Sequence, residues 1–161
     1  MKSFATVAAV ALAGALAITA PAVAQSVAER HTVQGATLDA RLAIGNVFDA
    51  QSRFNVARSE GDQATMELAA NKMLLALQAS SQAVAILDEL VDSTAYNERL
   101  DTEVKDLLVL VTRGEVVVSE HVETGDMAAL GTGLDNSADW FTGILIDGRR
   151  VLDEVTTYRT E

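Results

Sequence analysis

The sequence predicts an all-α protein: an antiparallel up-down four-helix bundle with heptad-like seams, preceded by a cleaved signal peptide. Three observations carry this prediction. The 161 residues contain one proline and only 4% aromatic residues, and Ala, Leu, Glu, Asp and Gln are frequent, a composition that favours helices. Apolar residues recur at steps of three and four. Cysteine is absent, so the core and not a disulfide must hold the fold.

The first 24 residues have the pattern of a secretory signal peptide. Lys2 supplies the positive start, residues 4–20 are mostly apolar, and an Ala-x-Ala end follows Pro21 at residues 22–24. We expect cleavage after Ala24 and a periplasmic or secreted protein. The apolar run is short for a membrane span, so no stable insertion is expected after cleavage. The remaining residues 25–161 are expected to form one bundle domain.

The mature chain is strongly acidic. Removal of Lys2 leaves 11 basic and 23 acidic residues, a formal net charge of −12. Such a charge repels phosphate backbones and anionic lipid surfaces, so nucleic acid is not an expected partner.

Four seams of apolar and small residues predict the four helices. In the first seam, alanine at every second position lets neighbouring helices approach closely. The first seam contains Val33, Ala36, Ala40, Ala43, Val47, Ala50, Phe54 and Ala57, and the second contains Met66, Ala70, Met73, Leu77, Ser80, Val84, Leu87 and Val91. The third contains Leu100, Val104, Leu107, Val111, Gly114, Val118 and His121, and the fourth Leu130, Leu134, Ala138, Phe141, Leu145, Gly148, Leu152 and Val155.

Short connections predict antiparallel neighbours. Gly61 precedes Asp62, and Gly125 precedes Asp126. In each corner the glycine suits a left-handed helix end and the aspartate suits the cap of the next helix. Capping oxygens at residues 92–94 predict the connection between the second and third helices.

Two segments leave an alternative open. Residues 107–118 are rich in β-branched residues around Gly114 and would also suit a β-hairpin, but a lone hairpin is marginal and the sequence offers it no partner strands, so helix is favoured. Gly131 and Gly133 could break the start of the last helix, in which case Asp135 or Ser137 would cap it instead.

Missing residue types exclude much of the chemistry known from helical bundles. The absence of cysteine excludes thiolate nucleophiles, Cys-ligated zinc, iron–sulfur clusters and covalent c-type haem. No Glu-x-x-His pair of a di-iron centre, no Gly-x-Ser-x-Gly and no Walker A loop is present. We therefore expect no catalytic activity and no cofactor.

An alternative hypothesis is a haem b or copper site. His121 is the one ionisable residue on a seam, and Met66 and Met127 fall at the same end of the predicted bundle. A His and Met pair can ligate haem iron or copper. The competing interpretation is that His121 favours the negative end of its own helix while the methionines fill gaps in the core.

The last predicted helix has more apolar residues than one bundle face requires. Trp140 and Ile144 share a face, separate from Phe141 and Leu145 on the seam. The pair predicts a surface for a protein partner or a small apolar ligand, unless it widens the core face. The sequence thus predicts an exported binding or interaction module, and its heptads leave room for helix pairing between chains in a homodimer.

Overall fold

A computed structural model describes residues 32–92 and 98–158, which form five helices and no strand. The prediction of an all-α fold is confirmed. The predicted signal peptide of residues 1–24 and the connection over residues 93–97 lie outside the described residues. The helices are α2 (Val33–Glu60), α3 (Gln63–Asp92), α4 (Glu98–Thr124), α5 (Met127–Asn136) and α6 (Ala138–Tyr158).

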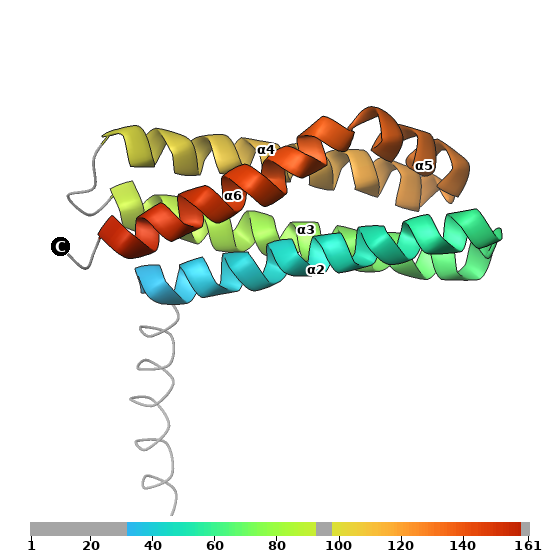
Figure 1. Ribbon diagram of the computed structural model, residues 1–161, viewed down its shortest axis with the longest axis horizontal. Helices are drawn as coiled ribbons and strands as arrows, with labels where there is room; N and C mark the ends of the chain where they lie inside the picture. Colours follow the sequence, from blue (N-terminus) through green and yellow to red (C-terminus); the bar gives the residue numbers. More distant parts are fainter. Residues whose placement is uncertain (1–31, 93–97, 159–161) are drawn as a thin grey trace, which may run out of the picture.

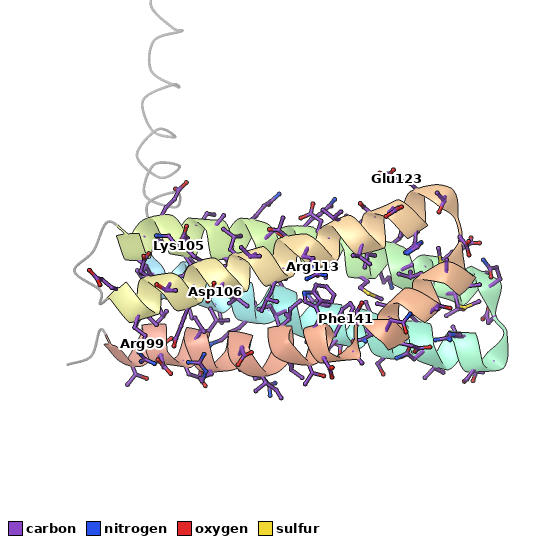
Figure 2. The ribbon with its side chains drawn as sticks, turned by 90° about the horizontal axis from the view of Figure 1, so that it is seen from above. Arg99, Lys105, Asp106, Arg113, Glu123 and Phe141 are labelled. Carbon is purple, nitrogen blue, oxygen red and sulfur yellow. The ribbon has the colours of Figure 1, made fainter. Side chains whose placement is uncertain are left out.

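The helices lie side by side along one long axis (Figure 1). Helices α2 and α3 form one pair, and α4 packs on α3 while α6 packs on both α2 and α4. The short helix α5 lies at the end of the molecule that also holds the turn between α2 and α3 (Figure 1). A single cluster of buried residues draws on all five helices, and Phe141 lies in it between α4 and α6 (Figure 2).

The first three seams form the core as expected. All eight residues of the first seam are buried, as are the second seam from Ala70 to Val91 and the third from Leu100 to Val118. Residues 107–118 are helical within α4. The β-branched residues are tolerated there because Leu107, Val111 and Val118 bury their side chains on one face, and burial outweighs the modest helix propensity of valine.

Both glycine corners have the predicted geometry. Gly61 has a φ of 72° and Gly125 a φ of 69°, the left-handed conformation that glycine adopts without steric cost. The carboxylate of Asp62 accepts a hydrogen bond from the Thr65 backbone N–H at 3.1 Å, and that of Asp126 from the Ala129 N–H at 2.9 Å. Each corner therefore ends one helix and starts the next within two residues.

The prediction of a single helix over the fourth seam is wrong. Residues 127–158 form α5 and α6, which meet at Ser137. The backbone carbonyl of Ser137 accepts hydrogen bonds from the N–H groups of Trp140 and Phe141, both at 3.0 Å, so it starts a new helix. Gly131 and Gly133 do not cause the break, because both lie inside α5.

From Phe141 onward, one residue of the predicted seam within α6 is also wrong. The predicted seam used Leu145, but Ile144 is the fully buried residue and Leu145 is only partly buried. The other predicted seam residues of this stretch, Phe141, Gly148, Leu152 and Val155, are buried. The predicted seam differs there only in taking a step of four from Phe141 where the fold takes a step of three, because both steps stay on one face of a helix.

Candidate functional site

The residues predicted to form a partner surface, Trp140 and Ile144, lie largely within the fold. Ile144 is 0% exposed. Trp140 is half-buried, its indole Nε1–H donates a hydrogen bond to the Leu110 backbone carbonyl at 3.0 Å, and its ring meets Phe141 edge to face. The described residues thus match the alternative that the pair widens the core face of the last helix.

Gly114 explains how α6 brings the indole so close to α4. A Cβ atom added at Gly114 would lie 1.9 Å from Cη2 of Trp140, a separation that two non-bonded carbon atoms do not tolerate. The missing side chain of Gly114 is the space that the indole ring fills. Trp140 therefore anchors α6 on α4.

His121, Met66 and Met127 occupy one end of the molecule, as the sequence predicts. Met127 is buried and Met66 packs partly buried against the core. Nε2 of His121 lies over α5, where a Cβ added at Gly133 would be 3.7 Å from it. Among the described residues, no group of three or more His, Asp or Glu side chains is placed to hold a metal ion. The haem or copper hypothesis stays a prediction that an absorption spectrum and metal analysis would test.

An open groove between α2 and α3 is a surface feature that sequence reasoning missed. Two adjoining cavities, of about 380 and 330 Å³, follow the outer side of this helix pair. Alanines line its inner side, which keeps the two helices close and the surface shallow. These are Ala50 and Ala76 in the first cavity and Ala57 and Ala69 in the second, all buried.

Large apolar side chains line the groove and face solvent. Leu75 in the first cavity is 66% exposed, and Leu68 and Val56 in the second are 56% and 54% exposed. Leu38 and Leu42 add two further exposed leucines on α2. Large exposed apolar side chains gathered on one face mark binding surfaces more often than scattered ones do.

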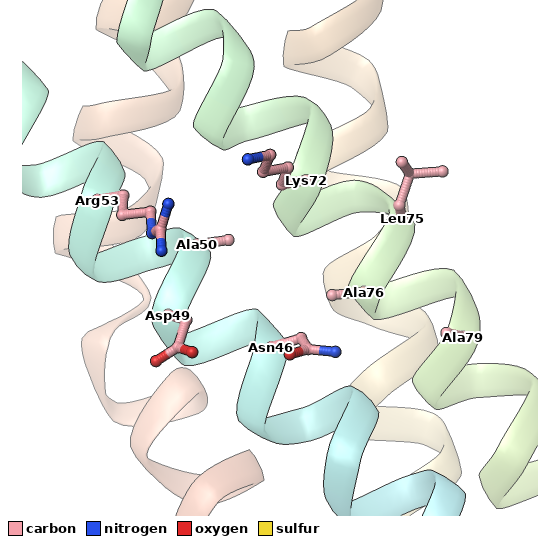
Figure 3. Close-up of a pocket in the computed structure, with 8 residues that line it drawn as sticks. All are labelled: Asn46, Asp49, Ala50, Arg53, Lys72, Leu75, Ala76 and Ala79. Atoms are coloured by element: carbon pink, nitrogen blue, oxygen red, sulfur yellow. The ribbon is translucent and has the colours of Figure 1, made fainter.

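Charged residues are interspersed with the apolar ones. Arg53 on α2 and Lys72 on α3 line both cavities, and Figure 3 shows them reaching toward one another across the groove. Asp49 lies at one end, and Glu60 and Asp62 lie at the end near the turn. Hydrogen bonds from Thr65 lower the pKa of Asp62, so its carboxylate stays ionised as the cap of α3.

A signal for this groove exists in the sequence but is weaker than the core signal. Leu68, Lys72, Leu75 and Ala79 also follow steps of four, three and four, so α3 has a second stripe beside its buried one. The apolar character of α3 is high enough that, by length and composition only, Gln63–Val91 could cross a membrane. A core helix passes the same test, and α3 packs against both α2 and α4.

Comparison of the chain with protein-family models, with curated proteins and with solved structures finds no match.

Proposed function

We propose that the chain is an exported helical-bundle binding module without catalytic activity, which docks a partner in the groove between α2 and α3. The proposal of export to the periplasm or the medium depends on the signal-peptide pattern of residues 1–24. In this proposal α5 and α6 together take the place of one interrupted helix. The domain is then an antiparallel four-helix bundle whose fourth helix is broken.

One observation carries the choice of site. Leu68 and Leu75 on α3 are more than half exposed beside an open groove with an alanine floor. Water around two exposed leucines is released when a partner covers them, which stabilises a complex by roughly 25 cal/mol per Å² of apolar surface. Trp140 and Ile144 offer no comparable apolar surface because Ile144 is fully buried.

Site-directed photo-cross-linking tests this proposal. A photoreactive phenylalanine analogue replaces Leu75 in one variant and Val116 in another, in cells that make the protein naturally. The positions form a matched pair, because Leu75 is 66% exposed on α3 and Val116 is 60% exposed on α4. We expect a discrete adduct from position 75 that Leu68→Glu abolishes, and none from position 116. Equal adducts from both positions, or none from position 75, would contradict the proposal.

A further inference from the structure

The centre of the α2–α3 groove carries two positive charges that no carboxylate of the described residues neutralises. Neither Arg53 nor Lys72 forms a hydrogen bond or salt bridge there, although both line both cavities. Five other cations of the described residues form salt bridges, whereas the exposed Arg113 and Arg149 outside the groove form none: the pairs are Arg41 with Asp153, Arg58 with Asp135, Arg99 with Glu103 and Glu154, Lys105 with Asp101, and Arg150 with Glu103 and Glu154. Two facing, unpaired cations in a chain of net charge −11 form a local site for an anionic group.

Apolar side chains flank this positive centre along the groove. Leu75 lies in the cavity on one side of the two cations, and Val56 and Leu68 lie in the cavity on the other side. The order along the groove is therefore apolar, positive, apolar. A ligand that fits this order has an acidic group between two apolar ones.

The dimensions of the groove favour a helix as the ligand. The α2 wall runs from Asn46 to Glu60, which at 1.5 Å per residue is about 21 Å, or four helical turns. Helices with an apolar face bind in long shallow grooves of this kind, whereas small apolar ligands favour enclosed pockets that bury most of their surface.

We propose that the groove binds an amphipathic helix of a partner protein whose apolar stripe carries an acidic residue at its centre, between Arg53 and Lys72. This inference depends on the docking function proposed above and names the class of its partner. The carboxylates of Asp49, Glu60 and Asp62 lie toward the ends of the groove. They repel a second acidic residue there, so the acidic residue of the partner is confined to the centre.

The same charges disfavour a second copy of this chain as the occupant. A symmetric dimer contact places the same surface on both chains. With the two-fold axis at the middle of the groove, Arg53 and Lys72 would face the cations of the other copy. Like charges brought together in an interface oppose binding.

Two synthetic helical peptides of 18 residues test the proposal. Both carry leucines at heptad spacing, and they differ only in the central residue of the stripe, which is Glu in one peptide and Lys in the other. Binding to the purified protein, expressed as the full chain, is measured by fluorescence anisotropy at low and high salt. We expect the Glu peptide to bind about tenfold more tightly, because two partly exposed charge pairs together give about that factor. The difference should shrink at high salt.

A matched pair of double variants isolates the two cations. The first variant combines Arg53→Gln with Lys72→Gln, and the second combines Arg113→Gln with Arg149→Gln. Both variants remove two positive charges, but Arg113 and Arg149 are exposed residues outside the groove. We expect the first double variant to bind both peptides equally and the second to keep the preference for Glu. Circular dichroism of both variants checks that they remain folded.

The remaining outcomes separate this inference from the docking function. Equal binding of both peptides by the unmodified protein, abolished by Leu75→Glu, would overturn the acidic partner and leave the docking function intact. Failure of both peptides to bind overturns the inference, and a missing cross-link at position 75 then overturns the docking function as well. A change from dimer to monomer on Leu75→Glu would identify a second copy as the occupant and overturn the inference.

Discussion

At the scale of single residues, the contact between Gly114 and Trp140 decides how closely α4 and α6 pack. Gly114→Ala introduces a methyl group into the space of the indole ring. Overpacking of a core costs about 1–3 kcal/mol, which outweighs the gain of about 1 kcal/mol that alanine gives a helix interior. We expect a lower free energy of unfolding and a red-shifted emission from Trp140, the single tryptophan. Urea unfolding followed by fluorescence measures both.

Gly45→Ala provides the control for this substitution. Gly45 lies in α2, and nothing stands within 4 Å of an added Cβ atom. Only the helix propensity changes there, so we expect a gain of up to about 1 kcal/mol. If Gly114→Ala were as stable as Gly45→Ala, the indole would not depend on the missing side chain.

The ion pair between Arg58 and Asp135 links α2 to α5 and makes stability depend on pH. Arg58 donates hydrogen bonds to the Asp135 carboxylate at 2.8 Å and to the Gly131 carbonyl at 3.2 Å. The first of these lowers the pKa of Asp135 in the folded state. A lowered pKa means that the stabilisation is complete above the unfolded pKa of about 4 and is lost as the pH falls through the folded pKa.

We therefore expect Asp135→Asn to lose less stability on acidification than the unmodified protein does. Thermal unfolding of both proteins, measured at intervals between about pH 6 and pH 2, gives the comparison. Asp139→Asn on α6 serves as the control, because Asp139 is exposed and forms no salt bridge within the described residues. Parallel pH profiles for the unmodified protein and Asp135→Asn would contradict the effect of Arg58.

At the scale of the helices, the corners between α2 and α3 and between α4 and α5 require glycine. An added Cβ atom at Gly61 or Gly125 would meet nothing within 4 Å, so the only cost of alanine is the left-handed backbone, about 1–2 kcal/mol. We expect Gly61→Ala and Gly125→Ala to destabilise the protein by similar amounts, measured by urea unfolding. A stability unchanged by either substitution would show that the corner relaxes to another conformation.

The helices that could be predicted from the sequence are those whose core pattern runs unbroken between clear ends. The first seam has eight small or apolar positions in an unbroken three-and-four pattern, and all eight residues are buried. A glycine corner marks its end. The single fourth helix is wrong because its three-and-four pattern continues across the restart at Ser137, and the sequence offers Ser137 as a helix start only as an alternative. The sequence places Ile144 on a surface although it lies in the core, because the step of four from Phe141 to Leu145 fits a helix face as well as the step of three to Ile144 does.

The candidate groove could not be predicted because its residues are unremarkable one at a time. Leu75 and Lys72 become a site only when α2 lies beside α3 and brings Arg53 opposite. A second stripe on α3 is visible in the sequence, but a periodic pattern does not tell whether another helix of the same chain covers it. The solvent exposure of Leu68 and Leu75 decides whether the stripe is covered, and that exposure depends on how all the helices are arranged.

At the scale of the whole molecule, net charge and the exposed leucines of α3 act against each other. The charge of −11 keeps copies of the protein apart at neutral pH, whereas Leu68 and Leu75 favour association. Protonation of carboxylates near pH 4 removes much of the repulsion. We therefore expect the protein to be monomeric at pH 7 and to self-associate as the pH approaches about 4.5, which sedimentation velocity measures directly.

Two neutral double variants identify the surface responsible. Leu68→Gln with Leu75→Gln removes apolar side chains from the groove, and Val109→Gln with Val116→Gln removes two of similar exposure from α4. Neither changes the net charge, so both keep the same repulsion at every pH. We expect the first variant to self-associate less than the second at low pH, because Leu68 and Leu75 can pack on an apolar surface elsewhere on another copy, whereas two grooves face to face remain disfavoured by Arg53 and Lys72. If the α4 variant lost self-association and the groove variant kept it, the surface responsible would lie on α4 instead.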